Sequence, residues 1–433
     1  MKIAIDAFNL GMKEGTGIAT YGRELASVLS NARHEVFPIY GFEKVAHKRP
    51  EAYSQFIQRL AVDGEAEKKE ILRWLPIFFS GIPSYLLGRP FKVHNLSESD
   101  SIVFGSIKSK IPNHSRIFNS PSIYRVAQAY SFFLSRNLKL KLPHELDLLH
   151  LTCPLPISAV KIPKVVTVHD IIPLIAPSTT EVNLRHYYSM IETSIKDANA
   201  IFAVSESAKR DLINLFKISE ERVHVTYQSS EIPQEYKNLS RDDVSLYLSN
   251  TYKHKLKYGQ YFLFYGAIEP KKNVENIIQA FARAKTDFPI VIVGKNGWLF
   301  QEVEKLIAHM PRSKVIRIPY LPFPELMFLL KGTKALVFPS YYEGFGLPVL
   351  EAMQMGCPVI TSHTSSLPEV AGNAVHYVDP YDVTSIVKAV EKFCDDSVYV
   401  DDLIKKGHLQ SEKFSREKYL SRLQAGYDMA LNR

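Results

Sequence analysis

The segment Ser340–Met353 contains residue types that can bind a phosphate. The apolar run Ala335–Phe338 precedes it, and Pro348 stands where a helix is expected to begin. The loop between them consists of Gly344, Phe345, Gly346 and Leu347. Glycines let backbone N–H groups approach an anion, and the amino end of a helix adds partial positive charge. The sequence therefore predicts a phosphate-binding turn between a buried strand and a helix.

Two carboxylates flank this turn and are candidates for sugar binding. Glu343 precedes the loop, where a hexose hydroxyl or the anomeric carbon can reach it. Glu351 falls in the first turn of the expected helix, where its carboxylate can accept two hydroxyl hydrogen bonds, as from a ribose. In the alternative interpretation Glu351 only complements the helix dipole and Glu343 is an ordinary turn residue.

A pair of adjacent lysines follows another expected strand. Lys271 and Lys272 come after Tyr261–Tyr265, and the residues from Gly266 to Asn273 are typical of a turn that opens a helix. Ligands of open α/β sheets bind at the carboxyl ends of the strands. Two ammonium groups in that place can neutralise a diphosphate leaving group. The alternative is a pair of surface lysines without a ligand.

His169 and Asp170 end an expected strand in the N-terminal half. A histidine at a strand end that faces a ligand-binding cleft is a candidate for acid–base chemistry. The alternative is a histidine that is hydrogen-bonded to an adjacent loop. His150 ends another strand and is a second such candidate, whereas Asp6, in the first strand, is interpreted as structural.

Short apolar runs alternate with helical spacing in both halves, which predicts two doubly wound α/β domains facing each other across a cleft. In the N-terminal half we expect strands at Met1–Ala7, Glu35–Ile39, Asp147–Leu151, Lys164–His169, Ala200–Val204 and Val223–Tyr227. In the C-terminal half we expect them at Tyr261–Tyr265, Ile290–Val293, Val315–Ile318, Ala335–Phe338, Pro358–Thr361 and Ala374–Val378. The predicted domains are 1–240 and 258–412, joined by a polar linker from Ser229 to Tyr258. A last helix within 413–433 is expected to pack back on the first domain.

The excess positive charge of the chain lies in one segment. The net charge of the whole chain is +8, and residues 44–141 contain 16 Lys and Arg against 7 Asp and Glu, a net +9. We interpret this aromatic-rich segment as helical decoration on the first domain. Its charge suits nucleic acid, an anionic membrane surface or an acidic substrate, or is only a solvated face.

Cysteine usage and motif absences limit the cofactors and the compartment. The three cysteines are scattered and lack a C-x-x-C pair, which argues against disulfides or a zinc site and for a reducing cytoplasm. An Asp-x-Asp triplet does not occur, so a metal bridging a diphosphate is not expected. No signal peptide is expected at the start, and no run approaches the about 20 apolar residues that span a bilayer.

Three of these motifs together resemble the retaining family 4 glycosyltransferases of GT-B fold. They are the pair Glu343 and Glu351 with seven residues between them, the turn Glu269–Asn273, and Ser365–Val370. The resemblance extends from Tyr261 to Pro380, is weaker in the N-terminal half and lapses between 44 and 141. It implies that Glu351 holds the ribose, that Glu343 and the turn bind the donor sugar and phosphate, and that the two lysines clamp the diphosphate.

The resemblance also implies contacts with the rest of the donor. It places Gly294 and Lys295 near the base, and Gly15, Thr16 and Gly17 over the phosphates from the other domain. His169 and Asp170 would lie at the sugar and acceptor side of the cleft. Many members of the family have an arginine directly after the glycine equivalent to Gly266, whereas this chain has Ala267. The positive charge is therefore expected from the lysine pair.

The expected function is retaining transfer of a hexose from a nucleoside-diphosphate sugar. The motifs look most like those of mannosyl- and rhamnosyltransferases of bacterial surface polysaccharides, which favours a GDP-sugar donor, no further cofactor, and a lipid-linked saccharide acceptor. Segment 44–141 would then meet an anionic membrane surface. No carboxylate stands out as a nucleophile, so a front-face displacement is favoured. The alternatives are a GT-B sugar-nucleotide epimerase or phosphorylase and a nucleic-acid-binding protein, for which no motif is found.

Overall fold

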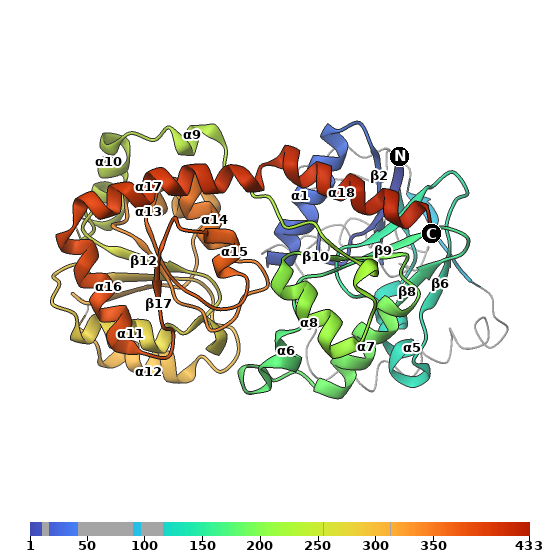
Figure 1. Cartoon of the computed structure of the whole chain (residues 1–433), viewed down its shortest axis with the longest axis horizontal. Coiled ribbons are helices and arrows are strands. Elements are labelled where there is room, and N and C mark those ends of the chain that lie inside the picture. Colours follow the sequence, from blue (N-terminus) through green and yellow to red (C-terminus); the bar gives the residue numbers. More distant parts are fainter. Residues whose placement is uncertain (11–16, 42–89, 97–115, 254, 312) are drawn as a thin grey trace, which may run out of the picture.

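The computed structural model describes residues 1–10, 17–41, 90–96, 116–253, 255–311 and 313–433. These residues form two lobes, each built on a mainly parallel sheet with helices packed against it (Figure 1). The predicted α/β class with two doubly wound domains is confirmed.

The N-terminal domain is built on an eight-stranded sheet with the order β11-β10-β9-β7-β1-β2-β5-β4, in which the β4–β5 pair is antiparallel and the other pairs are parallel. Its strands are β1 (Lys2–Asp6), β2 (Glu35–Tyr40), β4 (His94–Leu96), β5 (Ile117–Asn119), β7 (Leu148–Leu151), β9 (Lys164–Val168), β10 (Ala200–Ala203) and β11 (Val223–Val225). A smaller sheet joins β3 (Phe91–Lys92), β6 (Leu138–Lys141) and β8 (Ile157–Ala159). The helices are α1 (Gly17–Asn31), α5 (Ile123–Leu134), α6 (Ile172–Ile175), α7 (Leu184–Lys196) and α8 (Glu206–Phe216).

The C-terminal domain has a six-stranded parallel sheet with the order β14-β13-β12-β15-β16-β17. Its strands are β12 (Phe262–Tyr265), β13 (Ile290–Val293), β14 (Val315–Ile318), β15 (Leu336–Phe338), β16 (Val359–Ser362) and β17 (His376–Val378). The helices around it are α9 (Gln234–Lys237), α10 (Arg241–Tyr252), α11 (Val274–Arg283), α12 (Gln301–His309), α13 (Phe323–Gly332), α14 (Leu347–Gln354), α15 (Leu367–Ala371), α16 (Val383–Asp395) and α17 (Ser397–Ser411).

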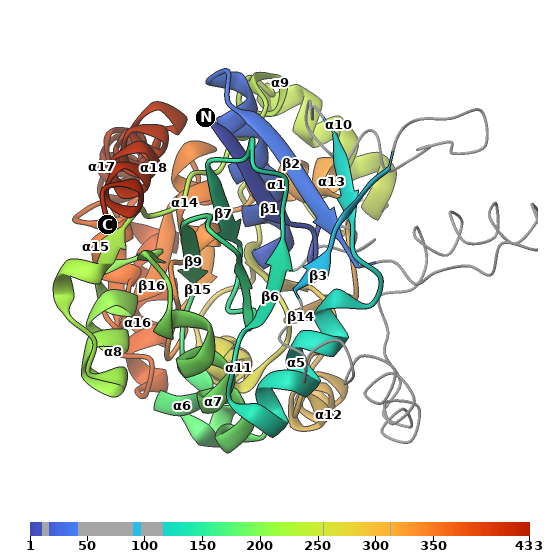
Figure 2. The same ribbon diagram turned by 90° about the vertical axis from the view of Figure 1, so that its right-hand side faces the viewer.

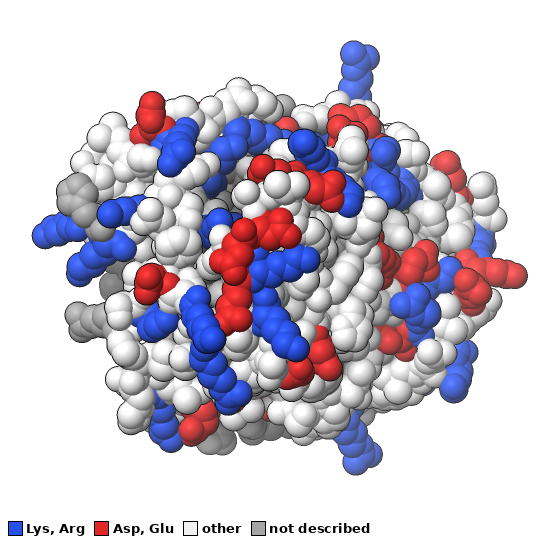
Figure 3. Space-filling model, turned by 60° about the vertical axis from the view of Figure 1, so that its left-hand side comes forward, with Lys and Arg blue, Asp and Glu red and all other residues white. Residues whose placement is uncertain are grey.

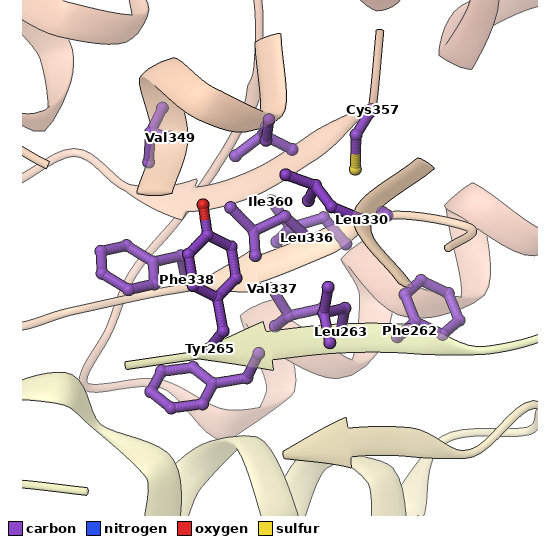
Figure 4. Close-up of a cluster of buried hydrophobic side chains, with 14 of the residues drawn as sticks. Phe262, Leu263, Tyr265, Leu330, Leu336, Val337, Phe338, Val349, Cys357 and Ile360 are labelled. Atoms are coloured by element: carbon purple, nitrogen blue, oxygen red, sulfur yellow. The ribbon is translucent and has the colours of Figure 1, made fainter. Parts of the chain in front are cut away.

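The core of the C-terminal domain explains why these sequences form these elements. All four residues of β13, Ile-Val-Ile-Val, are buried, as expected for a central strand of a parallel sheet that is covered on both faces. α11 buries Val274, Ile277, Ile278 and Phe281, a spacing that places one apolar face on the sheet. In the core shown in Figure 4, the hydroxyl of Tyr265 points from β12 toward the helix that carries Val349.

Each sheet has one point at which the strand order reverses. In the C-terminal sheet it lies between β12 and β15, and in the N-terminal sheet between β1 and β7. Ligands of doubly wound folds bind at the carboxyl ends of the strands at such a point. The loops that follow β12 and β15 contain Lys271, Lys272 and the turn after Glu343, so the C-terminal switch point collects the predicted donor-binding residues.

The predicted linker from Ser229 to Tyr258 is wrong for most of its length. It contains α9 and α10, and α10 buries Val244 and Leu248 in the core of the C-terminal domain. Tyr247 of α10 also stacks on Phe328 of α13, with 4.3 Å between the ring centroids. The polar composition was misleading because α10 attaches to the core mainly through two buried apolar residues one turn apart, while its first turn, Arg241–Asp243, is exposed.

Where the segment is described, the interpretation of 44–141 as helical decoration holds for α5 but is wrong for the strands. Most of the segment lies outside the described residues, which omit 42–89 and 97–115. The described part, however, contributes β4 and β5 to the main sheet, and β5 pairs with β2 through Phe118 and Asn119. α5 follows, and its Ile123 and Ala127 are fully buried. The aromatic and basic composition concealed these short strands because only three residues form each.

The C-terminal helices connect the two lobes. α17 lies on the C-terminal domain, and α18 (Arg416–Leu431) continues along the N-terminal domain, so the pair crosses the whole molecule (Figure 1). Viewed along the long axis, both helices lie on the same side of the molecule (Figure 2). Tyr419, Leu423 and Tyr427 of α18 are fully buried in the N-terminal core. The last helix is thus an integral part of the first domain's packing.

Candidate functional site

Lys272 and Glu343 form an ion pair at the C-terminal switch point. The Nζ atom of Lys272 lies 2.7 and 2.9 Å from the two carboxylate oxygens of Glu343, and the side chains are only 14% and 8% exposed. Lys272 also lies over the ring of Phe338, with Nζ 5.0 Å from its centroid. The loop after β12 is held to the loop after β15 by the backbone N–H of Tyr341, which donates to the carbonyl of Lys271 at 2.8 Å. The sequence motifs therefore meet in one site.

Lys271 lies beside this pair and differs from it in its contacts. Its Nζ atom is 3.8 Å from the carboxylate of Glu269, and its side chain is 17% exposed. Burial acts to lower the pKa of Lys271, but the nearby carboxylates of Asp170, Glu343 and Glu269 outweigh it, so the pKa is raised above the usual range. Lys271 is thus a firmly charged ammonium group at the edge of the site.

The turn after Glu343 is fixed by serines that precede α15. Ser365 Oγ accepts a hydrogen bond from the backbone N–H of Glu343 at 2.9 Å. Ser366 Oγ lies 2.9 Å from both the carbonyl of Glu343 and that of Phe345. Gly346 precedes α14 with φ of 105°, a conformation that favours glycine. The predicted phosphate-binding turn is therefore rigidly held between β15 and the start of α14.

Glu351 lies in the second turn of α14, not the first, because the helix begins at Leu347. Its carboxylate is occupied within the protein: Tyr265 Oη donates to one oxygen at 2.6 Å and Ser230 Oγ to the other at 3.2 Å. Burial raises its pKa, and these two hydrogen bonds oppose the rise. Glu351 is thus held in one orientation at the junction of the two domains.

Gly294 and Lys295 follow β13 at the same edge of the sheet. Gly294 has φ of 148°, and a Cβ atom there would lie 1.8 Å from the carbonyl oxygen of Gly266. Only glycine therefore allows the two strand ends to approach each other. Nζ of Lys295 lies 5.2 Å from the ring centroid of Tyr320.

The N-terminal domain contributes the loop His169–Asp170 to the junction. A Cβ atom on Gly344 would lie 2.4 Å from the carbonyl oxygen of His169 and 3.1 Å from Cβ of Asp170, so the two loops are in direct contact. The ring of His169 faces its own domain: Nε2 lies 2.9 Å from the carbonyl oxygen of Thr152, and Nδ1 3.3 Å from the amide of Gln228. Burial lowers its pKa. The imidazole is therefore engaged structurally on both nitrogens.

The predicted glycine loop over the phosphates is only partly visible. Gly15 and Thr16 lie outside the described residues, and Gly17 is the first residue of α1.

Asp170 lies at the start of α6. Its Oδ1 accepts a hydrogen bond at 3.0 Å from the backbone N–H of Ile172, the first residue of that helix. The charge of Asp170 also raises the pKa of Lys271, and its Cβ lies against Gly344, so Asp170 lies next to the C-terminal site.

Comparison with known proteins identifies the family. Residues 85–228 match the family described as Glycosyltransferase Family 4, and residues 252–410 match Glycosyl transferases group 1. O-antigen chain mannosyltransferase B of Escherichia coli is 30% identical over 262 residues, which cover 58% of this chain and 67% of that protein. The chain is a family 4 glycosyltransferase. Serotype-specific mannosyltransferase WbdA, also of Escherichia coli, is 32% identical over 276 residues, 61% of this chain but only 33% of that protein.

The fold of this glycosyltransferase is shared with solved GT-B structures. Sucrose-phosphate synthase from Thermosynechococcus elongatus superposes with a TM-score of 0.67 at 14% identity, covering 99% of this chain and 98% of that one.

Among the described residues of the glycosyltransferase, no group of three or more His, Cys, Asp or Glu side chains is placed to hold a metal ion. No helix in the described part of the chain is long and apolar enough to cross a membrane.

Sequence reasoning missed two residues of the glycosyltransferase site. Tyr265 holds Glu351 by a hydrogen bond. The sequence feature that could have indicated this role is a hydroxyl group at the end of an otherwise apolar strand. Asn273 has φ of 60°, is 2% exposed, and donates to the carbonyls of Pro339 at 2.9 Å and Pro380 at 2.7 Å. It thereby ties the lysine turn to the ends of β15 and β17, a role that its position in the lysine motif did not reveal.

Proposed function

We propose that this glycosyltransferase transfers mannose, with retention of configuration, from GDP-mannose to a hydroxyl of a lipid-linked saccharide. The names of the relatives support the sugar, since two of them are mannosyltransferases and one acts in O-antigen chain synthesis. The observation that carries the proposal is the grouping of Lys271, Lys272 and Glu343 at the switch point, in contact with the His169–Asp170 loop. A charged lysine beside a helix amino end suits a diphosphate.

The two lysines have different tasks in this proposal. Lys271 is the more loosely paired cation, with 3.8 Å to Glu269, and it meets the diphosphate. Lys272 is held by both oxygens of Glu343 and orients that carboxylate toward the hydroxyls of the donor sugar. Glu351, fixed by Tyr265, accepts hydrogen bonds from the ribose, and the Gly344–Leu347 backbone faces the phosphates.

The chemical step is a front-face displacement. The bond between C1 of the sugar and the β-phosphate oxygen breaks, while the acceptor oxygen bonds to C1 on the same face. The acceptor proton passes to the departing phosphate oxygen, so the nucleoside diphosphate leaves protonated once. Lys271 and the amino end of α14 stabilise the negative charge that develops on this leaving group, without a metal ion. A covalent mannosyl adduct trapped on Glu343 would contradict this step.

The first experiment is a donor panel. We expect GDP and GDP-mannose to raise the melting temperature more than UDP, ADP and their sugars, because binding to the native state stabilises it. We then expect GDP-mannose to be consumed only when a saccharide acceptor is present, with or without EDTA. Epimerisation of the donor without an acceptor, or sugar release that requires inorganic phosphate, would favour the alternative GT-B functions. Stabilisation by UDP alone would refute the proposed donor.

A membrane surface suits the lipid-linked acceptor. Phe132, Phe133 and Leu134 at the end of α5 are 59, 60 and 45% exposed, and Arg136 is exposed next to them. Aromatic and cationic side chains together favour the interface of an anionic bilayer. The face shown in Figure 3 differs from the end of α5, because acidic and basic side chains are mixed on it. We propose that the α5 end approaches the cytoplasmic leaflet.

Vesicle binding tests this orientation. The double substitution Phe132→Ser, Phe133→Ser should weaken sedimentation with phosphatidylglycerol vesicles by about tenfold, because it removes two exposed apolar side chains. Val398→Ser, at a position that is 79% exposed in the C-terminal domain, is the control and should bind as the wild type does. Equal binding of all three proteins would exclude this surface.

A further inference from the structure

Helix α8 of the N-terminal domain is capped by a carboxylate from the other domain. Glu369 of α15 accepts hydrogen bonds from the backbone N–H groups of Glu206 at 2.8 Å and Ser207 at 3.0 Å, the first two residues of α8. The third N–H, that of Ala208, donates to the N-cap Ser205 at 3.0 Å. One carboxylate of the C-terminal domain thus satisfies N–H groups that a helix otherwise leaves to water or to its own chain.

The N-cap residue of α8 also reaches across the junction. Ser205 Oγ donates to the carbonyl of Gly344 at 2.7 Å while it accepts from Ala208. Further along α8, the carboxylate of Asp211 accepts a hydrogen bond from the hydroxyl of Tyr342. The amino-terminal half of one helix is therefore attached at three points to the C-terminal domain.

Two of the three attachments reach the turn that carries Glu343 directly, and the third reaches it through α15. Tyr342 and Gly344 are its immediate neighbours, and Glu369 lies on the short helix α15. The serines before that helix, Ser365 and Ser366, hold the same turn by three hydrogen bonds. Separation of the two domains would break the contacts of Glu369 and Ser205 and release the turn from the His169–Asp170 loop.

The geometry points to an interdomain clamp, formed by Glu369 and Ser205, that couples closure of the two domains to the placement of the Glu343–Gly344 turn. Both are positioning residues, since neither touches the ion pair of Lys272 and Glu343 in the described contacts. The inference rests on the proposed transferase function for its kinetic consequence, whereas closure itself can be measured without any reaction. Charge-assisted hydrogen bonds of this kind are strong enough to favour one domain arrangement.

Glu369→Ala is the primary variant. It should lower kcat by about tenfold, which corresponds to the loss of a charge-assisted contact, while the dissociation constant of GDP changes less than about twofold. Ser205→Ala should act in the same direction but less, because it removes one bond across the junction. Small-angle scattering with GDP present should give a larger radius of gyration for Glu369→Ala than for the wild type.

Two matched controls separate the clamp from a loss of folding. Glu391→Gln removes a carboxylate that accepts a hydrogen bond from the backbone N–H of Lys285 at 2.9 Å within the C-terminal domain. Ser240→Ala removes the N-cap hydroxyl of α10, which accepts a hydrogen bond from the backbone N–H of Asp243 at 3.1 Å. Both should keep the wild-type kcat and radius of gyration. The clamp is refuted if Glu369→Ala matches Glu391→Gln in both quantities. If the wild type transfers no sugar from GDP-mannose, the proposed function fails, and the scattering comparison still decides the clamp.

Discussion

The two domains are both doubly wound but use their switch points differently. In the N-terminal domain Asp6, at the end of β1, accepts hydrogen bonds from the backbone N–H groups of Phe8 and Thr152. His150 of β7 is bonded on both ring nitrogens and is fully buried. In the C-terminal domain the equivalent edge carries Lys271 and the pair of Lys272 and Glu343, which retain some exposure.

Burial explains the difference. Desolvation raises the pKa of Asp6 to about 6 and lowers that of His150 to about 3, so burial disfavours the charged form of each residue. In the C-terminal domain opposite charges lie within reach of each other, and Lys271 has a raised pKa. At the N-terminal switch point burial thus works against charge, whereas the C-terminal switch point keeps a charged lysine for a ligand.

The largest effect should come from removing Lys271, which is paired more loosely than Lys272. Lys271→Met should lower kcat/KM by about 10²–10³, because a positioned cation stabilises the leaving group far more than it stabilises the ground state. Lys305→Met is the control, since Lys305 pairs with Glu302 on an exposed helix face. Steady-state rates with the donor chosen by the panel provide the measurement. If kcat/KM fell by less than about threefold, a group other than Lys271 would have to bind the diphosphate.

The fold was predictable because its strands are short, apolar and regularly spaced. β13 and β14 have the bounds expected from the sequence, since each is a short, mainly apolar run with turn residues on both sides. β5 was missed because Ile117–Asn119 is too short for a periodic signal. α10 was missed because polar residues dominate its composition, although Val244 and Leu248 anchor it.

The site was predictable in its members but not in their contacts. The motifs indicated Glu343, Lys272 and the turn, because each follows an apolar strand and precedes a helix. The motif did not indicate that Lys272 pairs with Glu343 and Lys271 with Glu269, because the direction of a side chain cannot be inferred from its place in the motif. Partners from distant sequence, such as Tyr265 for Glu351 and Glu369 for α8, leave no local pattern at all.

A smaller effect is expected at Glu351. Tyr265→Phe removes the 2.6 Å hydrogen bond that orients this carboxylate, and nucleotide affinity should fall by about five- to tenfold, the equivalent of one hydrogen bond. Calorimetric titration with GDP measures it. Tyr261→Phe is a matched control, because its hydroxyl donates to the carbonyl of Leu329 at 2.7 Å in the same domain. Equal affinity in the two variants would mean that Glu351 does not depend on Tyr265.

The smallest effect on activity, but a clear one on stability, is expected at His150 in the N-terminal domain. Its pKa of about 3 lies below the unfolded value of about 6.5, so the unfolded chain binds a proton that the native chain does not. Its contribution is therefore complete above about pH 6.5 and is lost as the pH falls toward 3, by up to about 1.4 kcal/mol per pH unit. Asp6, with a raised pKa, acts with the opposite sign between about pH 6 and 4.

The His150→Gln variant isolates the histidine from Asp6, because Gln offers hydrogen bonds to Tyr427 and Thr167 without titrating. Urea denaturation at pH 7 and pH 5 should show a smaller loss of stability on acidification in this variant than in the wild type, with kcat at pH 7 nearly unchanged. His309→Gln, on the exposed face of α12, should keep the wild-type difference. If His150→Gln instead abolished transfer while its stability at pH 7 stayed high, the N-terminal switch point would have a catalytic role, and the contrast between the two domains would be wrong.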